Sequence, residues 1–132
     1  MKIGQLLENH TIIDGDFNNL AVFNFKGVYI LYESKTQEVV YVGSAYARNI
    51  NERLKQYLRV NDSGNSLMHA ICKEDFNVNK VKEIDNEQKR KAVDKIKTLK
   101  IKAIHHKDLE YQLISESQPK YNKAGVEVDY TI

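Results

Sequence analysis

Two short apolar stretches separated by a polar loop constrain the fold of this chain most strongly. Residues 27–33 read GVYILYE and residues 38–43 read EVVYVG. Both are rich in the β-branched and aromatic residues that are typical of strands. The polar residues 34–37 between them have the length of a hairpin loop. We therefore expect an antiparallel hairpin that places Tyr29 and Tyr41 on neighbouring strands.

These two tyrosines have two interpretations. Each stretch also carries a glycine, Gly27 or Gly43, which lets another backbone or a ligand approach closely. Two phenols held side by side on a rigid sheet suit a proton-transfer site. The alternative is that both tyrosines are half-buried strand residues whose role is packing, and the hairpin by itself favours this second interpretation.

Length and composition indicate a single soluble domain. The chain has 132 residues, enough for one hydrophobic core. A net charge of +2 permits a nucleic-acid partner only if the positive charges are clustered. The single cysteine, Cys72, excludes an internal disulfide and is typical of a reducing cytoplasm. Neither a signal peptide nor a membrane span is evident, so we expect a cytoplasmic protein without a membrane partner.

Residues 46–60 have the pattern of an amphipathic helix. Their apolar residues fall at helical spacing and form one stripe. Arg53 lies beside this stripe, and Tyr57 follows four residues later, so the two side chains share one helix face. A solvated arginine is the usual meaning of such a position, and a substrate-facing arginine is the alternative.

The segment before the hairpin gives weaker signals. Ile3, Leu6 and Leu7 predict a short amphipathic helix, and residues 14–16, Asp-Gly-Asp, predict a turn. Residues 20–23 fit either a short strand or an apolar lead-in to the hairpin.

The segment after the first helix begins with a loop, residues 61–66. Asn65 or Ser66 is then the expected N-cap of a short helix that contains His69. Residues 73–98 are the most charged part of the chain, and Val81 and Ile84 suggest a strand ahead of a lysine-rich helix. That helix carries Lys89, Arg90 and Lys91, which form either a solvated face or a surface for phosphates.

The last third of the chain predicts one more strand and one more helix. Residues 99–105 alternate apolar and polar side chains, as a strand does. A helix follows from Asp108, with Glu110 near its start, and Pro119 ends it before an extended or turn segment at 118–122. Residues 125–132 suggest a peripheral strand or docked arm. His105 and His106 are unsuited to share one metal ion, because adjacent strand residues point to opposite faces.

The order of these stretches resembles that of the GIY-YIG nucleases. The first motif corresponds to Gly27-Val28-Tyr29 and the second to Tyr41-Val42-Gly43, and residues 41–45 are similar to the YVGSA stretch of homing endonucleases of this class. The family's arginine, glutamate and asparagine fall on Arg53, Glu110 and Asn122. The resemblance implies an α/β fold of the α+β type, with a small central three-stranded antiparallel sheet flanked by helices. It also implies one domain with an N-terminal extension at 1–26, an insertion at 73–98 and a C-terminal tail at 123–132.

The resemblance further implies a set of site residues. The expected catalytic residues are Tyr29, Tyr41, Arg53, Tyr57, Glu110 and Asn122. Glu110 is the expected ligand of Mg²⁺ or Mn²⁺, because one carboxylate can hold a divalent ion that keeps waters and takes phosphate oxygens. Some members have a histidine at the position of Tyr57 and a lysine at the position of Ser44. Ser44, Lys89, Arg90 and Lys91 are the candidate DNA contacts.

The chemistry of these residues is consistent with phosphodiester hydrolysis. Arg53 can grip a phosphate and offset its developing charge. Tyr29 or Tyr41 can orient or deprotonate a water, but the base role needs positive charge nearby, because a free phenol has a pKa of about 10. Asn122 is uncharged and suits a brace or hydrogen-bond donor.

We therefore expect a metal-dependent DNA endonuclease of the restriction or of the phage or mobile-element type. The alternatives are a structure-specific repair nuclease and a non-catalytic nucleic-acid-binding module with the same fold. The DNA-reading surface would come from the extension, the insertion or the partner in a homodimer.

Overall fold

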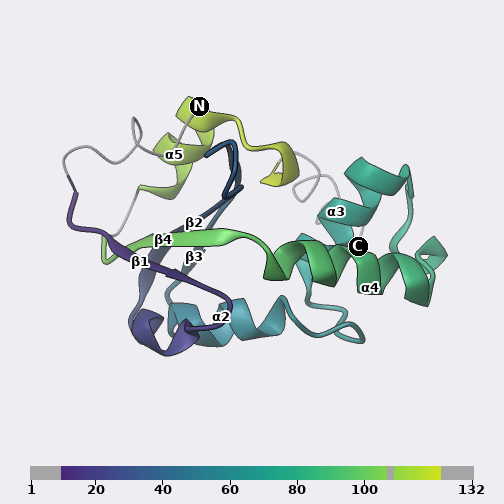
Figure 1. Cartoon of the computed structure of the whole chain (residues 1–132), viewed down its shortest axis with the longest axis horizontal. Helices are drawn as coiled ribbons and strands as arrows, with labels where there is room; N and C mark the ends of the chain where they lie inside the picture. The colour runs from purple at the N-terminus through teal and green to yellow at the C-terminus, as the bar shows by residue number, and fades with distance from the viewer. Residues whose placement is uncertain (1–9, 107–108, 123–132) are drawn as a thin grey trace.

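The chain folds around one antiparallel sheet that has helices on both faces (Figure 1). This computed structural model describes residues 10–106 and 109–122. The strand order is β1-β4-β2-β3. The strands are β1 (Ile13–Asp16), β2 (Gly27–Tyr32), β3 (Val39–Ala45) and β4 (Lys100–Ile104). The helices are α2 (Ile50–Gln56), α3 (Ser66–Phe76), α4 (Asn86–Lys97) and α5 (Glu110–Ser117), with 3₁₀ turns η1 (Leu20–Phe23) and η2 (Val81–Glu83).

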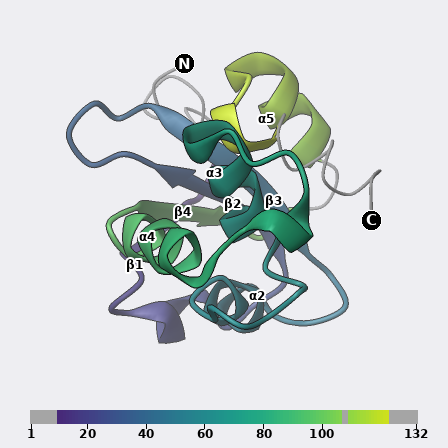
Figure 2. The ribbon, with the colours of Figure 1, turned by 90° about the vertical axis from the view of Figure 1, so that its right-hand side faces the viewer.

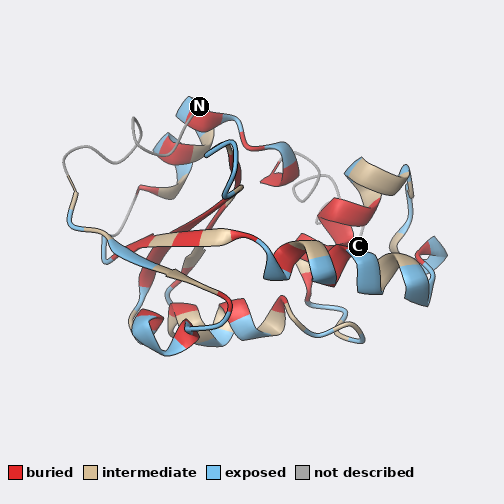
Figure 3. Cartoon of the chain, in the orientation of Figure 1, coloured by how far each residue is buried: buried red, intermediate tan, exposed pale blue. Residues whose placement is uncertain are grey.

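Strand β2 is the centre of the core, and all six of its residues are buried. Alternate residues point to opposite faces of the sheet. Tyr29 and Leu31 belong to a large cluster with residues of α2, α3 and α4, whereas Val28 and Ile30 belong to a smaller cluster with residues of α5. Helices α5 and α2 therefore lie on opposite sides of the sheet (Figures 1 and 2), and Figure 3 shows the buried strands between them.

The predicted hairpin is confirmed. Strands β2 and β3 pair antiparallel, with Tyr29 opposite Gly43 and Leu31 opposite Tyr41. Gly27 sits where a Cβ atom would lie 2.2 Å from the carbonyl oxygen of Ile104, so the backbones of β2 and β4 can approach only with glycine there. The hairpin and β4 supply the three strands of the expected central sheet.

The fourth strand corrects the expected turn at residues 14–16. These residues belong to β1, which pairs with β4 in the register Asp14 to Lys102 and Asp16 to Lys100. Both carboxylates form ion pairs with the lysines that face them, and cross-strand pairs of opposite charge stabilise a sheet. The aspartates therefore supply cross-strand contacts, and the expected three-stranded sheet has four strands.

Three further expectations were wrong in detail. The segment around Val81 forms a 3₁₀ turn where a strand was expected, and Asp85 follows it as the N-cap of α4 with a complete capping box. Residues 20–23, for which a short strand and an apolar lead-in were the two alternatives, form the 3₁₀ turn η1. Residues 120–122 are helical where an extended or turn segment was expected. Helix α2 is shorter than the predicted 46–60: it begins after its N-cap Asn49, whose backbone is extended with ψ of 156°, and it ends at Gln56.

Asn65 is the N-cap of α3, as one of the two expected alternatives, and accepts a hydrogen bond from the backbone of Met68 at 3.1 Å. The predicted helix of Ile3, Leu6 and Leu7 and the predicted arm at 125–132 lie outside the described residues. Within 10–106 and 109–122, no helix has the length and apolar character that a membrane span requires.

Candidate active site

Three tyrosines predicted as site residues gather on the α2 face of the sheet. The hydroxyl oxygens of Tyr29 and Tyr57 lie 2.5 Å apart in a hydrogen bond, and the rings of Tyr41 and Tyr57 meet edge to face with centroids 5.9 Å apart. Tyr29 and Tyr57 are only 1% and 0% exposed, whereas Tyr41 is half-buried. Tyr41 is therefore the member of this phenol cluster that solvent reaches most readily.

Arg53 lies against the phenol cluster because it stands one helical turn before Tyr57. Its guanidinium carbon is 4.8 Å from the centroid of the Tyr57 ring, a cation–π contact. The guanidinium donates hydrogen bonds to Gln56 Oε1 at 2.5 Å, the Gly64 carbonyl at 3.2 Å and Ser66 Oγ at 3.0 Å. These contacts fix a half-buried cation in one orientation beside the phenols.

The phenols are protonated at neutral pH. Burial raises the pKa of Tyr29, Tyr41 and Tyr57 above the ordinary value, and the nearby Arg53 charge offsets only part of this rise. The arginine alone therefore does not produce the lowered phenol pKa that a free tyrosine base needs. The cluster is suited to donating and relaying hydrogen bonds.

Glu110 lies on the other face of β3. Ser44 pairs with Val28, whose side chain faces α5, so Ser44 points towards α5 while its neighbour Gly43 points towards the phenols. Glu110 is the first residue of α5 and is half-buried. Burial raises the pKa of the Glu110 carboxyl, and a hydrogen bond with Ser44 partly offsets the rise. The predicted carboxylate and the predicted phenols thus flank the same edge strand from opposite sides.

Asn122 holds the free edge of that strand. Strand β3 is last in the sheet order, so within residues 10–106 and 109–122 one of its edges has no neighbouring strand. The side-chain amide of Asn122 accepts a hydrogen bond from the Val42 N–H and donates one to the Val42 carbonyl, both at 2.6 Å. Val42 lies between Tyr41 and Gly43 in β3, so these two hydrogen bonds fix the backbone on either side of it.

The predicted basic contacts are on a helix other than the one that carries Arg53 and Tyr57. Lys89, Arg90 and Lys91 are on α4, which packs against α3. Arg90 and Lys91 are exposed, and Lys91 forms an ion pair with Glu87 at 3.4 Å. The structure thus places Tyr29, Tyr41, Tyr57 and Arg53 together, Glu110 with Ser44, and the basic triplet on α4.

Gln56 belongs to the site but was missed in the sequence. Its side-chain oxygen accepts hydrogen bonds from both Arg48 and Arg53, and its nitrogen donates to Asp62 at 3.3 Å. Its position three residues after Arg53 places the two side chains on one helix face, and this spacing was the available signal.

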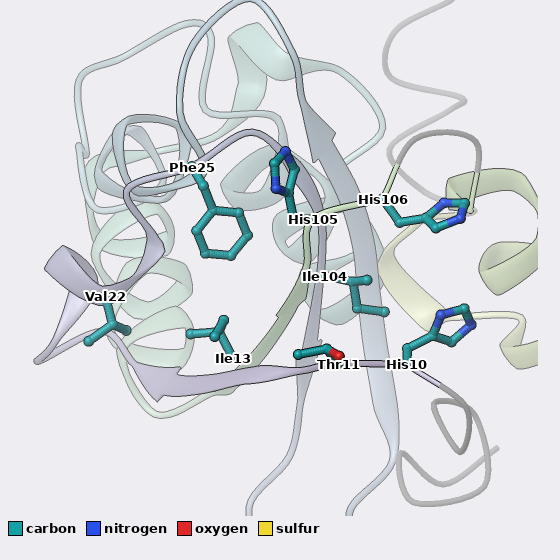
Figure 4. A pocket seen from close by; sticks show the side chains of 8 residues that line it. All are labelled: His10, Thr11, Ile13, Val22, Phe25, Ile104, His105 and His106. Atoms are coloured by element: carbon teal, nitrogen blue, oxygen red, sulfur yellow. The ribbon is translucent and has the colours of Figure 1, made fainter.

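A cavity of about 540 Å³ opens beside the end of β4 and shares no residue with the phenol cluster (Figure 4). In it the ring of His105 lies 5.8 Å from that of Phe25, and the ring of His106 lies 6.0 Å from that of His10. The two adjacent histidines therefore point in different directions (Figure 4). Within the described part of the chain, no three His, Cys, Asp or Glu side chains gather as a metal-binding group.

Comparison with known proteins agrees with this geometry. The family profile of the GIY-YIG catalytic domain matches residues 25–122, which contain every residue of the phenol cluster together with Arg53, Glu110 and Asn122. The chain belongs to the GIY-YIG family and is in general terms a nuclease. Comparisons with curated proteins and with solved structures gave no match.

Proposed function

We propose that this protein is a divalent-metal-dependent endonuclease that hydrolyses phosphodiester bonds in DNA. The observation that carries the proposal is the environment of Arg53. In the described part of the chain, this half-buried cation is held by neutral groups, namely Gln56, the Gly64 carbonyl, Ser66 and the phenols. A fixed cation among neutral partners suits an incoming anion, and a phosphate oxygen pair fits the planar donors of a guanidinium.

The site residues suit a divalent ion bound mainly by substrate and water. Glu110 supplies one carboxylate, with Ser44 beside it, which is the limited donor set that Mg²⁺ or Mn²⁺ accepts when phosphate oxygens and waters complete its shell. Burial raises the pKa of Glu110, and no cation of the described residues is among the causes that offset this rise. When bound, such an ion supplies Lewis-acid stabilisation of charge on the phosphate.

The other site residues bind the phosphate, orient the water or hold these groups in position. Arg53 binds the scissile phosphate and offsets the charge that develops on it. Tyr41, the most accessible phenol, orients the attacking water as a neutral hydrogen-bonding group. Tyr29 and Tyr57 hold Tyr41 and Arg53 in place through the buried hydrogen bond and ring contacts. Asn122 fixes β3, on which Tyr41 stands.

Cleavage of supercoiled plasmid tests this proposal. We expect conversion to nicked or linear DNA with Mg²⁺ or Mn²⁺ and none with EDTA. Full cleavage in EDTA would contradict the metal-dependent mechanism. No cleavage with any divalent ion, together with retained DNA binding, would favour the alternative of a non-catalytic binding module.

Among biological roles, we favour a restriction or phage-type enzyme over a structure-specific repair nuclease. The charged segment at 73–98 and the N-terminal segment offer surfaces of this chain's own for DNA reading. Digestion of unmethylated duplexes, compared with flaps, bubbles and junctions, separates the two roles: site-specific cleavage of plain duplex supports the first.

A further inference from the structure

Asp75 joins three parts of the fold that are distant in sequence. It lies near the end of α3, and its side chain is 15% exposed. The hydroxyl of Tyr121 donates to Asp75 Oδ2 at 2.7 Å. Lys95 Nζ on α4 lies 2.9 Å from the same oxygen, and Lys120 Nζ lies 2.9 Å from Oδ1. One carboxylate thus connects α3, α4 and the segment after α5.

The Asp75 network holds Tyr121 tightly. Tyr121 is 0% exposed, and the ammonium groups of Lys95 and Lys120 lie 5.2 and 5.3 Å from its ring centroid. Burial tends to raise the pKa of the Asp75 carboxyl, but hydrogen bonds from Lys120, Lys95 and Tyr121 hold it below its ordinary value. Asp75 is therefore a permanent anion between two cations, and the tyrosine hydroxyl is bound to a charged acceptor.

The network continues from Tyr121 to the strand that carries Tyr41. Asn122 follows Tyr121 in the chain and forms the paired hydrogen bonds with Val42. Among the described strands β3 is an edge strand, and these bonds hold it from the side that none of those strands covers. The contacts thus run without a gap from Asp75 through Tyr121 and Asn122 to Val42.

We infer that Asp75 is a positioning residue for the nuclease site, acting through Tyr121 and Asn122 to fix the edge of β3. This gives part of the charged segment 73–98 a task other than DNA contact: Asp75 and Lys95 both come from it. The expected effect on cleavage rests on the proposed function. The expected effect on the Val42 amide is independent of that function.

The sharpest variant is Tyr121→Phe, which removes one oxygen and keeps the ring. We expect amide hydrogen exchange at Val42 to accelerate about tenfold or more, the scale of a hydrogen bond to a charged acceptor. Exchange at Leu31, on the central strand β2, should not change. Tyr111→Phe is the matched control, because it makes the same change at a tyrosine that is 84% exposed.

Cleavage kinetics give the second readout. We expect Tyr121→Phe to lower kcat about tenfold with KM for DNA within about twofold, since the site is displaced while phosphate contacts remain. In an Asn122→Ala background, Tyr121→Phe should lower kcat no further, because both substitutions act through the contact between Asn122 and Val42. Asp75→Asn should also lower kcat.

Two results would overturn the inference. One is unchanged Val42 exchange in a folded Tyr121→Phe protein. The other is a loss of kcat that adds fully to that of Asn122→Ala, which would show a separate effect on the fold. If the wild-type protein cleaves no DNA, the proposed function fails, and the exchange measurement still decides whether Asp75 and Tyr121 hold β3.

Discussion

The ring of Tyr29 lies directly across the hairpin from Gly43, in the space that a Cβ atom at position 43 would occupy. The two residues are register partners on β2 and β3, and a Cβ on Gly43 would stand 2.4 Å from both Cζ and Oη of Tyr29. The tyrosine of the first motif and the glycine of the second are therefore parts of one packing arrangement. This arrangement places the Tyr29 hydroxyl within hydrogen-bonding distance of the Tyr57 hydroxyl.

Gly43→Ala tests this arrangement through stability. The added methyl group must displace the Tyr29 ring within a packed core, so we expect a loss of about 1–3 kcal/mol in the free energy of unfolding. Denaturant titration measures it. The loss should shrink in a Tyr29→Leu background, where the displaced atoms are absent. An equal loss in both backgrounds would show that Gly43 is needed for another reason.

Arg53→Ala should lower the cleavage rate by about a hundredfold or more, the usual scale for removal of a group that stabilises transition-state charge. Arg59→Ala is the control, because Arg59 follows the same helix, is largely exposed and pairs with Asp62 at 3.6 Å. Single-turnover rates of both variants check the expectation. A wild-type cleavage rate in Arg53→Ala would show that Arg53 has no part in catalysis.

The pH dependence of cleavage should report Glu110. A carboxyl whose pKa is raised stays protonated to a higher pH, so metal-dependent activity should appear only above the value of about 4.3 for free glutamate. Ser44→Ala removes the hydrogen bond that lowers this pKa, so the acid limb of the pH–rate profile should move to higher pH. Ser34→Ala, in the exposed hairpin loop, should leave it in place. A limb that stays or moves to lower pH in Ser44→Ala would contradict the assignment.

The basic triplet on α4 tests where DNA lies. If Lys89, Arg90 and Lys91 contact phosphates, their joint replacement by Glu should weaken binding and flatten its dependence on salt, because fewer counterions are released. Replacement of Lys26, Lys35 and Arg59 by Glu, three exposed cations outside α4, applies the same charge change. Equal effects of the two sets would assign α4 a solvated role and leave DNA reading to other surfaces.

Acid stability provides a test of the Asp75 network that needs no substrate. Its carboxyl has a folded-state pKa below the ordinary value, so its stabilising contribution is present above the unfolded-state pKa of about 3.9 and is lost as the pH falls through the lower folded-state value. The unfolding free energy of Asp75→Asn should therefore fall less than that of the wild type between neutral and strongly acid pH. Parallel curves for both proteins would contradict this.

The sequence predicts the parts of the fold that depend on local pattern. The hairpin, α4 and β4 each show a clear period of apolar residues, and the spacing of Arg53 and Tyr57 already places them on one helix face. Strand β1 was missed because Asp-Gly-Asp has the local chemistry of a turn. What makes it a strand is pairing with Lys100 and Lys102, which lie 84 and 88 residues further along the chain.

Which residues form the site was easier to predict than how these residues are arranged in space. Glu110 and the phenols were expected in one place, but their relation depends on which face of the sheet α5 covers. That choice is made by packing of Leu109 and Leu113 against β2 and β3, which no local pattern reveals. The link from Asp75 to Asn122 is hidden for the same reason, since it joins residues from three separate elements.

The most direct test of the central claim is cleavage by Glu110→Gln, a change that keeps the size of the side chain and removes its charge. We expect cleavage with Mg²⁺ to fall by at least about a hundredfold, while affinity for DNA stays within about twofold because phosphate contacts carry most of it. Wild-type cleavage by this variant would contradict the assignment of Glu110 as the metal-binding carboxylate and, with it, the proposed mechanism.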